Sequence, residues 1–453
     1  MPPTTYHSLS IRFKKELPPT PPLPAVFQTL ACRWLPFTYF EWCRARYGSP
    51  FTIYPIDKAP VVFLSDPQHI REVLTAPATA LHPGVGGAAI TSIVGPDSFM
   101  LLEEDEHLRR RKTIAPAFNH KATRAHAEMV TKLVDREVAS WPLDTPIRIH
   151  PYLRDLTLKI ILRVVFSERE PALPALHTRV FDMLSVTKSF AVTEPRLRSL
   201  PGWHRTWQRF VRARDEMDQL MLGVIRRRRH APRQPGDVLD ILLSARHPDG
   251  SPASDRTVRD DIMSTILAGH ETTAATLAWA FQLLAHNPNV RERLIDELDS
   301  TTGETYLTAT VYEVLRHRPV FLFAIPRAVA RPIEIGGWTY TPPTQLLACI
   351  YLVQHDPALH QDPHTFRPER FLQTPPSPHT WLPWGGGRKR CPGHRLATLE
   401  MQTIIRATLT QRTVLPVSTR KERARWRSVI VTPHAESRII LRARRQRSGA
   451  FKG

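Results

Sequence analysis

The chain has 453 residues, of which 42% are hydrophobic and 23% are charged. This balance excludes a chain that is disordered throughout, and the length is sufficient for a large hydrophobic core. The net charge of +20 would suit nucleic acid, an anionic membrane or an acidic protein, but no zinc-finger spacing, RNP-type strand or basic region with heptads supports nucleic acid.

The N-terminal half of the sequence predicts helices and one hairpin. Residues 1–20 are polar and proline-rich and predict an extended lead-in, without the apolar stretch of a signal peptide. Helix is expected over residues 26–46 and 103–112. Residues 122–163 and 172–229 are expected to be mostly helical, with breaks at Pro171, Pro174, Pro195 and Pro201. Strands are expected over 51–56 and 60–65, a short helix from Asp66-Pro67, and a loop over 92–98. The arginine run 226–229 is expected to be a solvated helix end.

The C-terminal half predicts a long central helix, further helices and short strands. Helix is expected over residues 260–286, 306–317 and 395–409, and Asn287-Pro288 ends the first of these. Strands are expected over residues 333–335, 338–340, 427–432 and 438–441. Residues 346–353 fit either a buried strand or a short helix. Residues 443–453 form a basic tail, and the whole predicts a mainly α fold with small β-sheets (α+β).

The cysteines and the apolar runs indicate the compartment. Cys32, Cys43, Cys349 and Cys391 are widely spaced, form no CxxC pair and suggest a reducing environment. No apolar run reaches 18 residues. We therefore expect a soluble, cytoplasmic protein with no transmembrane anchor.

Polar residues interrupt the long helix in the segment Ala268-Gly-His-Glu-Thr-Thr. Thr272 can donate a hydrogen bond to the carbonyl four residues back and bend the helix. Such a bend opens a polar notch for water or a small ligand. The alternative is a helix with a few interior polar residues.

The segment around Cys391 places a thiol after three glycines and a basic triplet, just ahead of a helix. The helix N-terminus and the neighbouring cations favour the thiolate. Such a thiolate is either a nucleophile or a metal ligand.

Four motifs in order carry a resemblance. They are Ala268-Gly-His-Glu-Thr-Thr, Glu313-x-x-Arg316, Pro368-Glu-Arg-Phe371 and Trp384-Gly-Gly-Gly-x-x-x-Cys391-Pro-Gly393. Their order and spacing resemble the cytochrome P450 family, soluble bacterial type, over residues 20–442. The resemblance implies one triangular domain over 21–442, with haem between the long central helix and the helix after the cysteine.

The resemblance also implies a cofactor and its ligands. Cys391 is the axial thiolate of haem b (heme, iron protoporphyrin IX), and Gly387 and Gly393 let the backbone pass close to the porphyrin. His107, Arg111, Arg327 and Lys389 bind the propionates. Lys389 stands where the family has arginine, so which of Arg388, Lys389 and Arg390 reaches a propionate stays open.

The remaining implied roles concern catalysis, structure and substrate. Glu271 and Thr272 resemble the acid–alcohol pair that organises a proton relay from solvent. Glu313, Arg316 and Arg370 form a buried network behind the cysteine loop. A hydrophobic substrate would contact the loop 82–99 and five apolar residues, namely Leu267, Ala268, Phe321, Phe323 and Val429.

These roles imply a monooxygenase that oxidises a hydrophobic small molecule with O2 and two supplied electrons. An acidic ferredoxin, with its ferredoxin reductase, would dock on a basic cluster. That cluster comprises Arg388, Lys389, Arg390, His394 and Arg395. The alternatives are a peroxygenase or isomerase on the same fold, or a non-catalytic haem- or ligand-binding protein.

Overall fold

The structure is a computed structural model that describes residues 17–56, 58–83, 88–187, 189, 192, 198–231, 236–300, 303–427 and 429–444. Most of the predicted lead-in, residues 84–87 of the predicted pocket loop, and the tail from 445 lie outside the described residues.

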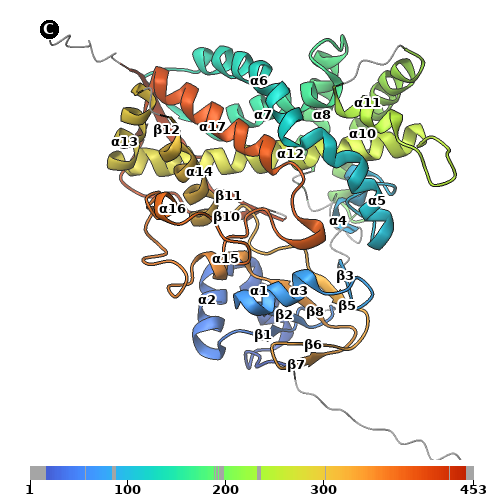
Figure 1. Ribbon diagram of the computed structural model, residues 1–453, viewed down its shortest axis with the longest axis vertical. Coiled ribbons are helices and arrows are strands. Elements are labelled where there is room, and N and C mark those ends of the chain that lie inside the picture. Colours follow the sequence, from blue (N-terminus) through green and yellow to red (C-terminus); the bar gives the residue numbers. More distant parts are fainter. Residues whose placement is uncertain are drawn as a thin grey trace, which may run out of the picture.

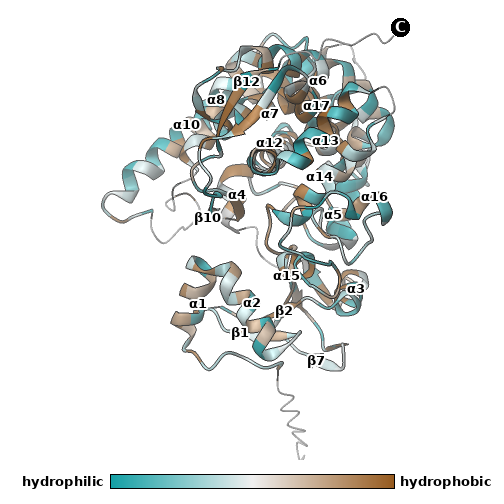
Figure 2. Cartoon of the chain, turned by 90° about the vertical axis from the view of Figure 1, so that its left-hand side faces the viewer, coloured by the Kyte–Doolittle hydropathy of each residue, from teal (hydrophilic) through white to brown (hydrophobic). Residues whose placement is uncertain are grey.

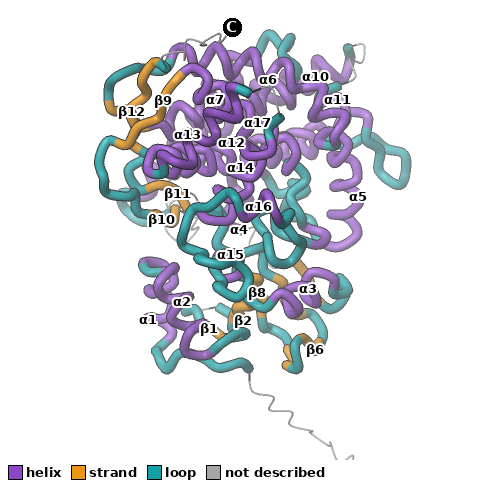
Figure 3. Tube along the Cα trace, turned by 60° about the vertical axis from the view of Figure 1, so that its left-hand side comes forward, coloured by secondary structure: helices purple, strands orange, loops and turns teal. Residues whose placement is uncertain are grey.

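A large helical region stands above a smaller region that holds the main sheet (Figures 1 and 3). The helices of the larger region are α4 (Ala88–Val94), α5 (Glu104–Ile114), α6 (His120–Ser140), α7 (Ile149–Phe166), α8 (Leu173–Val186), α10 (Trp203–His230), α11 (Val238–Ser244), α12 (Asp255–His286), α13 (Pro288–Asp299), α14 (Thr305–His317), α16 (Arg370–Gln373) and α17 (His394–Gln411). Helix α12 runs through the middle of this region (Figure 1).

The smaller region combines segments from both ends of the chain. Its helices are α1 (Ala25–Trp34), α2 (Pro36–Tyr47), α3 (Pro67–Thr75) and α15 (Ile350–Gln354). Its five-stranded sheet has the order β1 (Phe51–Ile53), β2 (Val61–Leu64), β8 (Gln345–Ala348), β5 (Arg327–Val329) and β3 (Leu81–Pro83). Only the β2–β8 pair of this sheet is parallel, and it joins Val61 to Gln345, 284 positions later in the sequence.

Three small antiparallel sheets complete the fold. One consists of β4 (Pro146–Arg148), β12 (Arg438–Ala443) and β9 (Arg412–Pro416), and the two hairpins are β6 (Ile333–Ile335) with β7 (Trp338–Tyr340) and β10 (Ala424–Arg427) with β11 (Ile430–Pro433). The prediction of mainly helix with small sheets is confirmed.

The core of the helical region lies between α7 and α12, which pack most extensively on each other. Both helices are buried on nearly all sides, with Phe166, Trp279 and Phe281 fully buried. Each such side chain contributes about 1.5–3 kcal/mol when it leaves water. Gly269 permits the close approach, because a Cβ there would lie 3.0 Å from Ile161 Cδ1.

Several predicted boundaries were wrong, each for a physical reason. The helix expected over 26–46 is two helices, since Pro36 disfavours helical backbone at Leu35. The mostly helical segment expected over 122–163 also contains strand β4, because that strand pairs with the distant β12. The loop expected over 92–98 begins as the end of α4. Residues 346–353 contain both a strand and a helix. The strand expected over 427–432 spans the end of β10, the turn and most of β11.

The arginine run at the end of α10 is not a free solvated end. Arg228 contacts Asp237 at 2.7 Å and Asp240 at 2.8 Å, and Arg227 contacts Glu170 at 3.0 Å. These ion pairs therefore connect the end of α10 to the start of α11 and to the segment before α8.

Candidate functional site

The cysteine loop lies against the end of α3. Gly387 has a φ of +60°, and a Cβ on it would lie 2.4 Å from the Leu74 carbonyl oxygen. The Cys391 amide donates to the Trp384 carbonyl at 2.9 Å and closes the loop. Glycine at 387 is therefore required by backbone geometry and by packing on α3, whereas a Cβ at Gly393 would meet no atom within 4 Å. That open space beside the cysteine fits a flat macrocycle.

Burial dominates the chemistry of the thiol. It raises the pKa of Cys391 although the Gly393 amide, Arg111 and Arg390 act in the opposite direction. The helix end and the cations thus favour the thiolate as expected, but in the protein alone burial outweighs them. A metal cation at the sulfur would supply the missing stabilisation, because a coordinating thiol is deprotonated. The site thus suits a ligand better than a free nucleophile.

Four cationic or N–H donor side chains lie close together beside the loop, namely His107, Arg111, Arg327 and Lys389. His107 is 4% exposed and Arg327 is 7% exposed. Burial, followed by the charges of Lys389, Arg111 and Arg327, lowers the pKa of His107 to about 4. Burial, then Arg327, lowers the pKa of Lys389 to about 8, although Glu103 opposes the shift. Each of these groups therefore disfavours the protonated, charged form of its neighbours.

No carboxylate of the described residues lies within ion-pair distance of these four groups. The Lys389 Nζ donates to the Leu102 carbonyl at 2.9 Å, and Arg327 donates to the Ile325 carbonyl at 2.8 Å. Buried cations without a counterion are costly, so a dianion such as the two haem propionates fits here. Arg388 and Arg390 are more exposed than Lys389, which favours Lys389 as the residue that reaches inward.

The long helix carries the expected notch. Thr272 Oγ1 donates to the Ala268 carbonyl at 2.7 Å, which confirms the predicted bond to the residue four positions back. Ala268 is exposed, although α12 is continuously buried from Thr257 to Ile266 and from Thr273 to Ala285. Exposure in the middle of a buried helix means that this turn faces a hollow. Leu267 is partly buried beside it.

Glu271 points toward α7. Its Oε2 lies 2.6 Å from Arg154 Nε, and its Oε1 lies 3.4 Å from His150 Nε2. Burial alone would raise the pKa of Glu271, but the contacts with His150 and Arg154 lower it to about 2. The carboxylate is therefore ionised. Sequence reasoning missed both partners, although a signal existed, since His150 and Arg154 are four residues apart and share one face of the helix.

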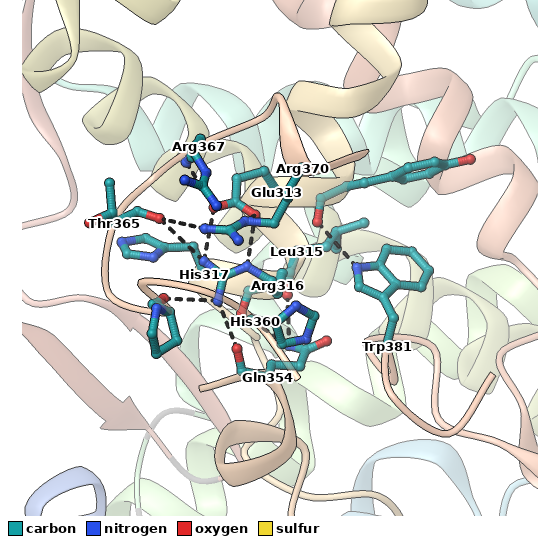
Figure 4. Close-up of polar contacts among 12 residues, drawn as sticks. Glu313, Leu315, Arg316, His317, Gln354, His360, Thr365, Arg367, Arg370 and Trp381 are labelled. Carbon is teal, nitrogen blue, oxygen red and sulfur yellow. Dashed lines mark hydrogen bonds and ion pairs between the residues drawn. The ribbon is translucent and has the colours of Figure 1, made fainter. Parts of the chain in front are cut away.

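The predicted network behind the loop forms (Figure 4). Arg316 Nε lies 2.7 Å and Arg370 Nε 3.0 Å from Glu313 Oε2, and Glu313 and Arg316 are fully buried. Arg316 also donates to the Gln354 carbonyl at 2.7 Å, and the Arg367 amide donates to Glu313 at 2.9 Å. These bonds join α14, α15 and the segment that leads to the cysteine loop.

Outside α12, the predicted apolar pocket residues come from two segments that meet. The Val431 amide donates to the Val320 carbonyl at 2.7 Å, and the Phe323 ring lies 5.7 Å from the Trp426 ring. Phe321 and Val429 are exposed. Hairpin β10–β11 reaches α12, because Trp279 donates to the Val431 carbonyl at 3.4 Å.

The loop after α4 is tied to α12 by two carboxylates. The Asp97 amide donates to Asp260 at 3.0 Å, and the Phe99 amide donates to Asp261 at 2.9 Å. Arg110 donates to the same Asp261 at 2.7 Å. The loop is thereby held next to the helix, a connection that no local pattern in the sequence indicates.

The chain is similar to known proteins over nearly its whole length. The family model described as Cytochrome P450 matches residues 17–440. The chain is 35% identical over 405 residues to Putative cytochrome P450 137 of Mycobacterium tuberculosis, covering 88% of this chain and 84% of that protein. It is 31% identical to Putative cytochrome P450 135B1 of Mycobacterium bovis over 439 residues, covering 95% and 92%.

Solved structures share the fold at lower identity. The retinoic acid-bound cyanobacterial CYP120A1 has a TM-score of 0.82 at 22% identity, covering 95% of this chain and 100% of that chain. The cytochrome P450DA heme domain has a TM-score of 0.81 at 20% identity, covering 95% and 98%. The chain therefore belongs to the cytochrome P450 family, whose members are monooxygenases that bind haem through a cysteine thiolate.

Proposed function

We propose that the protein hydroxylates or otherwise oxidises a hydrophobic small molecule, with Cys391 as the axial ligand of its haem. One atom of O2 enters the substrate and the other leaves as water, which consumes two electrons and two protons. Thiolate-bound haem supplies the site at which dioxygen is reduced and cleaved. The observation that carries the proposal is the hollow on α12, where Ala268 is exposed and the Thr272 hydroxyl sits beside ionised Glu271.

We assign binding of the cofactor to three groups of residues. His107, Arg111, Arg327 and Lys389 neutralise the propionates, which relieves the repulsion among these buried donors. Gly387 and Gly393, on either side of Cys391, let the backbone of the loop pass close to the porphyrin. The network Glu313, Arg316 and Arg370 fixes the segment that precedes the loop, and its role is structural.

We assign proton handling to Thr272 and Glu271. A hydroxyl can accept one hydrogen bond while it donates another, so Thr272 can hold a water molecule while it bonds to Ala268. Glu271 is ionised, and its carboxylate orients the next water molecule by accepting a hydrogen bond from it. Protons from solvent would follow this path. Leu267, Ala268, Phe321, Phe323 and Val429 exclude water around the substrate.

The test compares Thr272→Ala with Thr276→Ala. Thr276 makes the same type of bond one turn later, with 2.9 Å to the Thr272 carbonyl, but lies in the buried part of α12. A lipid, steroid and terpenoid library first identifies a ligand that shifts the haem spin state. With that ligand, Thr272→Ala should divert electrons to hydrogen peroxide, and Thr276→Ala should not.

Three results would overturn the proposal. Unchanged coupling in Thr272→Ala removes that residue from the relay. Full turnover with hydrogen peroxide and no electron donor indicates a peroxygenase. Spin-state shifts with no product under any electron supply indicate a ligand-binding protein.

We also propose an acidic ferredoxin, reduced by its reductase, as the electron donor. Arg388, Arg390 and Arg395 are exposed around the cysteine loop. An acidic partner would be steered to this face, so the rate of electron transfer should fall as salt rises. Arg388→Glu with Arg395→Glu should slow reduction, whereas Arg209→Glu on α10 should not. Equal rates in all variants, or no salt dependence, would refute this partner.

A further inference from the structure

The outer face of α1 is apolar throughout. Between residues 22 and 35 every exposed residue is apolar, namely Pro22, Leu23, Pro24, Val26, Phe27, Leu30, Trp34 and Leu35. Trp34 is 72% exposed, Leu35 62% and Phe27 57%. A helix on the surface of a protein in water normally turns such a stripe inward.

The polar side of α1 is the buried one. Gln28 is 2% exposed, donates to the Leu23 carbonyl at 2.7 Å and accepts from the Tyr54 amide at 2.9 Å. Thr29 accepts from the Ile56 amide at 2.9 Å. These bonds fix the rotation of the helix, so the apolar stripe is held toward solvent.

The same bonds extend the apolar surface. Tyr54 and Ile56 are exposed and lie beside α1 through their contacts with Gln28 and Thr29. We call this surface the α1 face, and it comprises Val26, Phe27, Leu30, Trp34, Leu35, Tyr54 and Ile56. Figure 2 shows α1 at the edge of the molecule with brown, hydrophobic segments. A contiguous apolar surface of this kind marks an interaction site.

Basic residues border the α1 face. Arg33 donates to the Trp426 carbonyl at 3.3 Å, which places β10 beside α1. Arg423 and Arg425 are exposed near that contact, and Lys58 is exposed two residues after Ile56. No acidic side chain is exposed among residues 17–56 and 58–65. The surface therefore combines apolar side chains with positive charge.

We propose that the α1 face docks on the surface of an anionic lipid bilayer. Tryptophan and tyrosine suit the boundary between headgroups and acyl chains, and arginine and lysine are attracted to anionic lipids. The ten residues of α1 span about 15 Å, half the thickness of a bilayer core, so the helix would lie in the interface. Among the described residues no helix is suited to cross a bilayer.

A second copy of the chain fits this face less well. With a net charge of +20, two copies would bring like-charged borders together. The face also adjoins the proposed substrate pocket, because Trp426 contacts both Arg33 and Phe323. This last link rests on the proposed function, whereas the docking itself does not.

Vesicle flotation of the full-length holoprotein tests the proposal. Phosphatidylcholine vesicles that contain phosphatidylglycerol should carry the protein upward, and phosphatidylcholine vesicles alone should carry less. Phe27→Ser with Trp34→Ser should lower the partition coefficient at least about tenfold, since two aromatic side chains no longer leave water. Arg423→Glu with Arg425→Glu should remove the preference for anionic vesicles.

The control is Tyr152→Ser, which changes an exposed aromatic residue on α7. It should bind as the unaltered protein does, and an unchanged haem spectrum shows that each variant is folded. No flotation with either vesicle, or equal binding of the Phe27/Trp34 variant, would overturn the proposal. The proposal would also be overturned if the protein formed a dimer in the absence of vesicles and the Phe27/Trp34 variant were a monomer. Because flotation needs no turnover, its failure leaves the proposed chemistry unaffected.

Discussion

Arg154 Nε on α7 lies 2.6 Å from Glu271 Oε2 on α12, and the side chain of Arg154 is 9% exposed. The ion pair joins the two most extensively packed helices at the turn that holds Thr272. A buried carboxylate next to a fixed guanidinium keeps its charge and its orientation. We therefore infer that Arg154 is a positioning residue for the relay.

Replacing Arg154 should make the relay sensitive to pH. In Arg154→Gln, burial of Glu271 is no longer offset by the guanidinium, so the pKa of Glu271 should rise from about 2. Its ionised fraction would then fall as pH is lowered. Peroxide release per electron should increase, most at low pH, whereas Arg154→Lys should recover part of the coupling. If peroxide release per electron in Arg154→Gln equals that of the unaltered protein and does not change with pH, Arg154 does not have this role.

Two glycines of the cysteine loop form a matched pair. Gly385 and Gly387 have φ values of +63° and +60°, so alanine at either position carries left-handed strain of about 1–2 kcal/mol. Only at Gly387 would the Cβ also meet the Leu74 carbonyl, at 2.4 Å. Gly387→Ala should therefore release haem faster than Gly385→Ala when transfer to apomyoglobin is followed. Equal release rates would show that the contact with α3 does not constrain the loop.

The buried network should be essential for stability. In Glu313→Gln, Arg316 and Arg370 lose their carboxylate, and a stranded buried charge costs roughly 3–5 kcal/mol. Urea unfolding of the holoprotein measures this loss. Glu292→Gln is the control, because that carboxylate is 66% exposed beside Arg291 and should contribute about 0–1 kcal/mol. Similar losses in the two variants would contradict the assigned role.

Glu400 on α17 should make the protein less stable as pH rises. It is buried with Oε2 unpaired, and burial raises its pKa well above 4.5. The folded state therefore binds this proton more tightly than the unfolded state, and the stabilisation present below pH 4.5 is lost as pH rises toward the folded pKa.

Glu400→Gln should remove this dependence. The variant should be at least as stable as the unaltered protein at pH 8, as followed by urea unfolding across pH 5–8. Glu128→Gln, an exposed carboxylate on α6, should leave the pH profile unchanged. A Glu400 variant that is less stable at pH 8 would show that the charged form has a favourable partner.

Local patterns predicted much of the site. The Thr272–Ala268 bond and the Glu313–Arg316 pair span four and three residues, so helical periodicity alone places them. The β6–β7 hairpin follows from Gly336-Gly337 in the same way. Features set by neighbouring residues on one element could be derived from the sequence.

Contacts between distant segments could not be derived in this way. Arg154 and Glu271 are 117 positions apart, and strand β4 exists because β12 pairs with it. Likewise, Lys389 is distinguished from Arg388 and Arg390 only by its lower exposure and by the bond of its Nζ to the Leu102 carbonyl. These features depend on tertiary packing, which no local pattern encodes.

The carbon monoxide spectrum of the reduced holoprotein tests most directly whether Cys391 is the thiolate ligand of the haem. The unaltered protein should show the red-shifted Soret band of thiolate-ligated haem, and Cys391→His should bind haem without that band. A band at the same position in Cys391→His, or its absence from the unaltered protein, would contradict the assignment.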